Sequence, residues 1–174
     1  MIQFSNPSAD LFIPDDSEPS QALGRTTHLG VGAHQDDLEV MALHGILACY
    51  KQPEKWFGGV TVTNGAGSSR TNEYADYTDE QMQAVRAEEQ CKAAVVAEFG
   101  FVAQLDYPNS TVKQPGNSDY AADLRTILAV TKPEVVYTHN LADKHDTHVA
   151  VVVPLIRALR ELPADDRPAE VYGV

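Results

Sequence analysis

The chain has 174 residues, a length that suits a single domain with a core of its own. Hydrophobic residues make up 43% of the sequence and charged residues 22%, as in ordinary globular proteins. The formal net charge of -12 argues against a nucleic acid or an anionic membrane surface as partner, and it leaves small molecules open as ligands.

Residues 1–24 are rich in Ser, Pro, Asp and Asn. We expect them to form an irregular N-terminal arm in front of a folded domain that covers residues 25–174. The arm has no basic start and no long apolar run, so we expect no signal peptide. No stretch of the sequence approaches the roughly 20 apolar residues of a membrane span. We therefore expect a soluble, cytoplasmic protein without membrane insertion.

Beyond the arm, short apolar runs alternate with longer helical patterns. The sequence predicts strands at residues 26–32, 58–64, 101–107, 133–139 and 169–174. It predicts the intervening helices at residues 36–51, 78–100, 119–131 and 146–162. This alternation is typical of crossover units. We therefore predict an α/β fold, with a Rossmann-like three-layer αβα arrangement around a mainly parallel sheet.

Four of the six histidines lie at the ends of two predicted strands. The segment AHQDDLE follows the first strand, and THNLADKHDTH begins at the end of the fourth. Ligands of such sheets bind beyond the carboxyl ends of the strands, which lie at one edge. We therefore expect the two segments to meet there and to form a site.

The residue types in these segments suit a catalytic metal, which takes three N or O ligands from the protein and keeps one position open. His34 and Asp37 are three residues apart at a predicted helix start, and His148 can supply a third ligand. Such a site suits zinc, and also Fe(II) or another divalent ion. Asp36 is then a free carboxylate beside the metal and a candidate general base, while His145 is left to donate a hydrogen bond or a proton.

The two segments also carry a resemblance to a known family. AHQDDLE resembles the AHPDDxE motif of the PIG-L/LmbE-like N-deacetylases, and DKHDTH resembles their DxHPDH motif. Three stretches between these motifs, in the family's order, resemble its second strand with a glycine loop, its long helix and its third strand: VTVTNGAGSSR, VRAEEQCKAAVVAEFGF and LDYPN. The resemblance runs from about residue 29 to about residue 153.

By this resemblance the chain is a hydrolase that uses a divalent metal, usually zinc, to remove acetyl groups from N-acetylglucosamine-type compounds. The expected partner is a small N-acetylated sugar. The resemblance implies that His34, Asp37 and His148 are the metal ligands, that Asp36 is the base, and that His145 is the electrophilic or acid histidine.

Three further residues are site candidates. Arg70, in the loop after the second strand, matches the place of a substrate contact. His139, at the end of the fourth strand, is a second candidate for the substrate pocket. Asp143 matches the acid of the family's DxH element, and we expect it to orient a neighbouring histidine.

The motifs depart from the family's pattern at Gln35, which replaces a proline, and at Asp146 and Thr147, which replace the Pro-Asp of HPDH. None of these changes removes a proposed ligand or the base. Family members usually continue beyond the last predicted strand, so we expect C-terminal elements of the family to be missing from this chain.

Two other hypotheses stay open. The chain could be a non-catalytic or truncated metal-binding relative. It could instead bind a nucleotide, with GAGSSR as the phosphate cradle, although this loop lacks the G-x-G-x-x-G pattern and follows the second strand. The sequence also leaves a homo-oligomer open.

Overall fold

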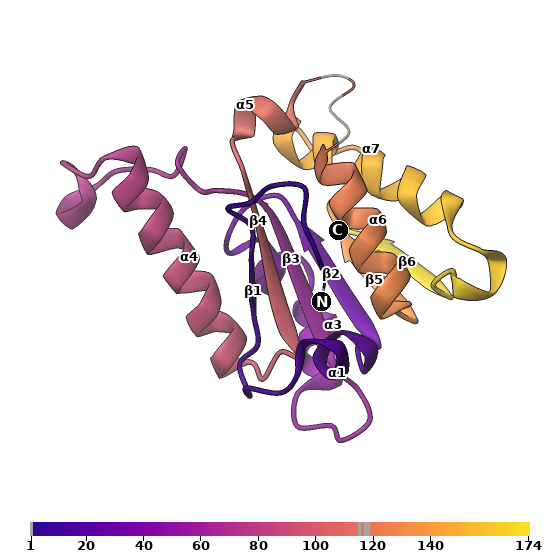
Figure 1. The fold of residues 1–174 in the computed structure, drawn as a ribbon. Helices are drawn as coiled ribbons and strands as arrows, with labels where there is room; N and C mark the ends of the chain where they lie inside the picture. The colour runs from indigo at the N-terminus through magenta and orange to yellow at the C-terminus, as the bar shows by residue number, and fades with distance from the viewer. Residues whose placement is uncertain (1, 115, 117–118) are drawn as a thin grey trace.

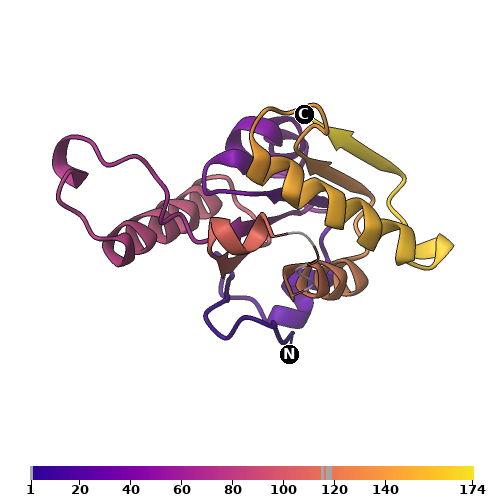
Figure 2. The same ribbon diagram turned by 90° about the horizontal axis from the view of Figure 1, so that it is seen from above.

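The computed structural model describes residues 2–114, 116 and 119–174, which form a sheet with helices on both faces (Figures 1 and 2). The strands are β1 (Asp10–Phe12), β2 (His28–Gly32), β3 (Phe57–Thr63), β4 (Phe101–Tyr107), β5 (Val135–Thr138) and β6 (Glu170–Gly173). Their order in the sheet is β1-β4-β3-β2-β5-β6. β1 runs antiparallel to β4, and the other neighbouring strands are parallel. The predicted mainly parallel sheet is confirmed.

The helices divide between the two faces of the sheet. Leucines of the helices α1 (Pro19–Gly24), α6 (Asp119–Thr131) and α7 (Asp146–Glu161) join one core cluster with β2, β3 and β4. The helices α2 (Asp37–Met41), α3 (Leu43–Cys49) and α4 (Asp79–Val96) contribute to a second cluster on the opposite face. The remaining short elements are α5 (Asn109–Val112) and the 3-10 turns η1 (Asn72–Tyr74) and η2 (Ala164–Asp166). The predicted three-layer αβα arrangement is therefore confirmed.

The order of the strands fixes where a site can form. β2 and β3 are buried along their whole length, as expected for central strands of a parallel sheet. The chain moves outward from β2 through β3 to β4, and then returns to place β5 on the other side of β2. The carboxyl ends of β2 and β5 therefore flank the point where the winding reverses, which is where open α/β sheets bind ligands.

The helix predicted at residues 36–51 is two short helices in the structure. Ala42, with φ -105° and ψ 14°, separates α2 from α3. The change of direction lets Leu38 on α2 and Ile46 on α3 both pack into the cluster around Phe57. The hydrophobic pattern predicted the buried face correctly, but it did not reveal the break, because an alanine is compatible with a continuous helix.

The N-terminal segment is more ordered than predicted. β1 and α1 both lie within residues 1–24, so the expectation of an irregular arm is wrong for these elements. β1 satisfies the open edge of β4, which would otherwise leave backbone groups unpaired. Before β1, the Ser5 N–H donates to the buried carboxylate of Asp123, and the Asn6 side chain donates to the carbonyl of Leu105. The segment is therefore attached to the sheet and to α6.

Within the described part of the chain, no helix combines the length and the apolar composition that a membrane crossing requires.

Candidate functional site

The ends of β2 and β5 bring the three predicted metal ligands together. One carboxylate oxygen of Asp37, Oδ2, lies 3.5 Å from His34 Nδ1, and the other, Oδ1, lies 3.6 Å from His148 Nε2. Asp37 therefore stands between the two imidazoles. Histidine nitrogens and a carboxylate oxygen are the donors that zinc and similar divalent ions prefer.

Two overlapping groups in this region have ligand atoms within 4.8 Å of one another: His34 with His145 and His148, and Asp37 with His139 and His148. His148 belongs to both groups, and the predicted set of His34, Asp37 and His148 takes its other two members one from each group.

The turn between β2 and α2 places Asp37 at the end of the strand. A side chain at Gly32 would bring a Cβ within 2.9 Å of the Asp37 Cβ, so glycine is needed for this close approach. The backbone N–H of His34 donates to Asp37 Oδ2 over 2.6 Å. Burial alone raises the pKa of the Asp37 carboxyl, but hydrogen bonds from His139 and His34 outweigh burial and hold this pKa well below its usual range. Asp37 is therefore a ready anionic ligand.

The carboxylate of Asp143 contacts the His148 ring. The Nδ1 atom of His148 lies 2.8 Å from Asp143 Oδ2, which leaves Nε2 facing Asp37. The other oxygen of Asp143 accepts the backbone N–H of His145. These bonds, first from His145 and then from His148, lower the pKa of the Asp143 carboxyl. A carboxylate behind a ligating histidine fixes the ring and makes it a better ligand.

His139 lies beneath the cluster and does not line the cleft. It is buried, its ring stacks on His148 with centroids 3.8 Å apart, and its Nε2 lies 3.1 Å from Asp37 Oδ2 and 3.0 Å from the backbone nitrogen of Ala33. A ring nitrogen has one lone pair or one hydrogen, so Nε2 serves one of these contacts at a time. Whether or not Nε2 carries the hydrogen, it is engaged in one of these contacts. His34 is therefore more accessible than His139 as a third ligand beside Asp37 and His148.

His145 stands at the solvent side of the cluster. Its ring stacks on His148 with centroids 4.3 Å apart, and its side chain is half exposed. Burial and the neighbouring His148 and His34 lower the pKa of the His145 imidazole. A histidine in this position can face a bound molecule while it remains beside the ligand cluster.

Asp36 is held in an unusual conformation by α4. Its backbone is left-handed, with φ 83°, a conformation that costs energy for a residue with a side chain. Its N–H donates to Gln90 Oε1 over 3.2 Å, and its Oδ2 accepts from Arg86 Nη2 over 2.8 Å. Arg86 also donates to the carbonyl of Gln35. Because Arg86 and Gln90 are four residues apart, they lie on the same face of α4, and together they bind the carboxylate and the backbone N–H of Asp36. The Asp36 side chain stays 69% exposed.

Gln35 connects this turn to the loop after β3. It is buried, and its side-chain amide donates to the carbonyl of Thr63 over 3.0 Å. A side chain at Gly65, which has φ 74°, would place a Cβ 2.7 Å from Gln35 Oε1 and 2.8 Å from the Arg86 Cβ. The loop therefore packs directly on Gln35. A proline at position 35 would lack this amide contact, so the departure from the family's motif has a structural role.

Arg70 is not brought to the cluster. Its guanidinium donates to the carbonyls of Tyr77 and Ala66 and pairs with Asp79, so it holds the loop between β3 and α4 closed on itself. It is absent from the residues that line the cleft over the described part of the chain. The structure gives the predicted substrate contact no support.

A cleft of about 580 Å³ opens above the cluster. Its walls include His34, Asp36, His145 and His148, together with Arg86. The loop and η1 add hydroxyl groups, and α5 adds an amide: Ser68, Ser69, Thr71, Tyr74 and Asn109. Asn109 Nδ2 lies 3.3 Å from His34 Nε2. Sequence reasoning missed these polar groups and Arg86, because nothing in their local pattern says which way a loop or a helix faces.

The family model described as PIG-L, GlcNAc-PI de-N-acetylase, matches residues 29–159, which is well over half of the chain. Among solved structures, the N,N'-diacetylchitobiose deacetylase of Pyrococcus horikoshii aligns with a TM-score of 0.67 at 19% identity, over 82% of this chain and 52% of that protein. The deacetylase of the A40926 pseudoaglycone aligns with a TM-score of 0.60 at 20% identity, over 79% of this chain and 60% of that protein.

A third similar structure is the 4-carboxy-2-hydroxymuconate hydratase of Pseudomonas putida, with a TM-score of 0.55 at 20% identity, over 86% of this chain and 62% of that protein. The chain thus spans between half and two thirds of the length of these three relatives. No curated protein sequence gives a significant match. At these identities the structural likeness establishes a shared fold, and one fold supports different reactions.

Proposed function

Because the chain belongs to the PIG-L (GlcNAc-PI de-N-acetylase) family, we propose that it is a metal-dependent hydrolase that removes the acetyl group of a small N-acetylglucosamine-type substrate. One observation carries this proposal. His34, Asp37 and His148 converge at the point where the winding of the sheet reverses, and Asp36 lines the cleft beside them.

The donor set fits a divalent metal. Asp37 is anionic, His148 is oriented by Asp143, and His34 lies on the other side of Asp37. We assign these three residues as the ligands and zinc as the metal, with Fe(II) or another divalent ion as the alternative. Zinc held by such a set polarises a substrate carbonyl and makes water acidic near neutral pH.

The chain's own residues would supply proton transfer and stabilisation of the developing negative charge. Asp36 accepts a proton from the water that attacks the acetyl carbon. Arg86 holds its carboxylate, Gln90 holds its backbone N–H, and Asp36 lines the cleft. His145 donates a hydrogen bond to the acetyl oxygen as negative charge develops there. The proton taken up by Asp36 returns to the departing nitrogen, so that acetate and a free amine leave the site.

The polarity of the cleft supports a sugar as substrate. Hydroxyls of Ser68, Ser69, Thr71 and Tyr74 and the amide of Asn109 surround the position above the cluster. Such groups can both donate and accept, which matches the hydroxyl groups of an amino sugar. A cleft of this size accommodates a small molecule.

The test is acetate release from a panel of N-acetylglucosamine conjugates, measured together with metal content. We expect release that is abolished by chelation and restored by zinc, and loss of bound metal in His148→Ala. Zinc content unchanged by His148→Ala would overturn the ligand set. Bound zinc without turnover on any N-acetyl sugar would favour a non-catalytic relative, and addition of water to a carbon–carbon double bond would favour a reaction like that of the hydratase.

A further inference from the structure

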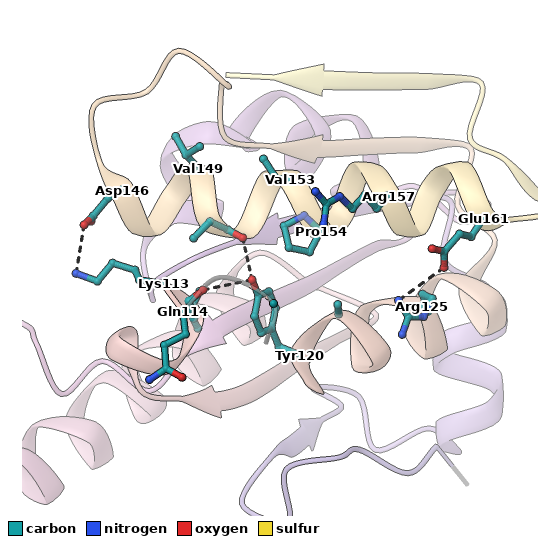
Figure 3. Close-up of a pocket in the computed structure, with 14 residues that line it drawn as sticks. Lys113, Gln114, Tyr120, Arg125, Asp146, Val149, Val153, Pro154, Arg157 and Glu161 are labelled. Carbon is teal, nitrogen blue, oxygen red and sulfur yellow. Dashed lines mark hydrogen bonds and ion pairs between the residues drawn. The ribbon is translucent and has the colours of Figure 1, made fainter. Parts of the chain in front are cut away.

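A second cavity, also of about 580 Å³, lies between α7 on one side and α5 and α6 on the other (Figure 3). Its long wall is a stripe of α7 at helical spacing: Val149, Ala150, Val153, Pro154 and Arg157. α5 and α6 form the opposite side. We call this cavity the α6–α7 groove. Asn109 faces the catalytic cleft, whereas Lys113, just after α5, faces the groove, so the two cavities are separate.

The floor of the groove is apolar and fixed in place. Tyr120 is buried under it, and its hydroxyl lies 3.0 Å from the carbonyl of Ala150 and 3.3 Å from that of Val112 (Figure 3). One side chain of α6 therefore links α5 to α7 from below. Above it, Val153 remains 36% exposed, so apolar surface stays open to solvent between the helices. An apolar ligand body would cover this surface at little cost in ordering.

Two of the three basic side chains that line the groove form ion pairs, and the third does not. Lys113 pairs with Asp146 at 3.3 Å at one end, and Arg125 pairs with Glu161 at 3.6 Å toward the other. Arg157 projects between them and has no ion pair with any residue that the structure describes (Figure 3). Arg157 therefore places a local positive charge above the apolar floor, where it can pair with an external anion.

We propose that the α6–α7 groove binds a medium-chain carboxylic acid, with the carboxylate on Arg157 and the hydrocarbon chain along α7 toward Val149. The arginine fork matches a carboxylate, with two parallel hydrogen bonds. Arg157 and Val149 are eight residues apart, which is about 12 Å along a helix, a span that the tail of decanoate can cover. Because Asp146 and Glu161 pair with Lys113 and Arg125, Arg157 is the one basic side chain of the groove without an ion pair among the described residues, and a single carboxylate suffices to pair with it.

Binding of decanoate to the whole chain, measured by isothermal titration calorimetry below the micellar concentration, tests this proposal. We expect saturable binding by the wild type and a dissociation constant about tenfold higher for Arg157→Gln, because a charge-assisted pair is lost. Arg160→Gln is the matched control. Arg160 lies on the same helix, is exposed and does not line the groove, so this variant should bind as the wild type does.

Two further measurements separate the contribution of the ligand's hydrocarbon tail from that of its carboxylate. Decanol should bind the wild type more weakly than decanoate does, and it should bind Arg157→Gln as well as it binds the wild type. Val153→Glu places a carboxylate over the apolar floor at a position that is already partly exposed, so the fold should tolerate it and decanoate binding should be lost. Failure of decanoate to bind the wild type, or equal effects of Arg157→Gln and Arg160→Gln, would overturn the proposal.

Discussion

Replacement of Arg86 by methionine tests how the catalytic turn is held. Arg86 donates to Asp36 Oδ2 over 2.8 Å and to the carbonyl of Gln35, and it pairs with Glu89. The side chains of Asp36 and Glu89 are 69% and 43% exposed, so each ion pair contributes about 0.5 kcal/mol to the free energy of unfolding. The hydrogen bond to the carbonyl adds about 1.5 kcal/mol. We therefore expect Arg86→Met to lower the free energy of unfolding by about 2.5 kcal/mol.

The effect of Arg86→Met on turnover should be larger than its effect on stability. Without the guanidinium, the Asp36 carboxylate is free to rotate away from the cleft, and a misplacement of about 1 Å can cost a factor of about 100 in rate. We expect kcat for acetate release to fall by about that factor, with little change in KM and in bound zinc. Denaturant unfolding, steady-state kinetics and metal analysis measure the three quantities on the same preparation.

Lys92→Met provides the control for the same helix. Lys92 pairs with Glu88 at 3.3 Å on the exposed face of α4, so its loss should cost less than about 0.5 kcal/mol and leave kcat unchanged. If Arg86→Met keeps the kcat of the wild type, or if Lys92→Met loses as much, the idea that α4 orients Asp36 is refuted.

Further predictions concern the support of the metal ligands and the core. Asp143→Asn should weaken zinc binding by about tenfold or more in a chelator competition, because it loses the charged partner of a ligating histidine; unchanged affinity would contradict this role. Gly65→Ala should lower stability by about 2 kcal/mol in denaturant unfolding, since φ 74° and the close contacts with Gln35 and Arg86 both disfavour a side chain. Tyr107→Phe should cost about 2 kcal/mol by removing a 2.8 Å hydrogen bond to the buried Asp123, and wild-type stability would refute this. Burial raises the pKa of the Cys49 thiol from 9.0 to about 11, so the folded state favours the neutral thiol and loses stability as pH rises through this interval. Alkylation of Cys49 near pH 8 should therefore require unfolding, and fast labelling of the folded protein would be the contrary result.

The sequence was sufficient to predict the order of elements and the edge at which the site forms. His34 and His148 are more than 100 positions apart, and they meet because parallel strands place their carboxyl ends at one edge. This inference needed only the strand ends to be recognised. It did not depend on the details of any loop.

What could not be predicted depends on contacts between distant segments. The three residues of β1 become a strand only because β4 offers them an open edge. Arg70 and Arg86 look alike as candidates, yet Arg70 folds back on its own loop while Arg86 crosses to the turn at Asp36. Which arginine reaches the site is decided by the packing of α4 against that turn, and local sequence does not encode it.

The most direct test of the central claim is acetate release by Asp36→Asn at known zinc content. Asp36 is adjacent to a proposed ligand, but its carboxylate is held by Arg86, and the residue lines the cleft. We predict that the variant binds zinc as the wild type does and loses nearly all acetate release from a substrate that the wild type cleaves. Retention of full turnover with normal zinc content would contradict the assignment of Asp36 as the base.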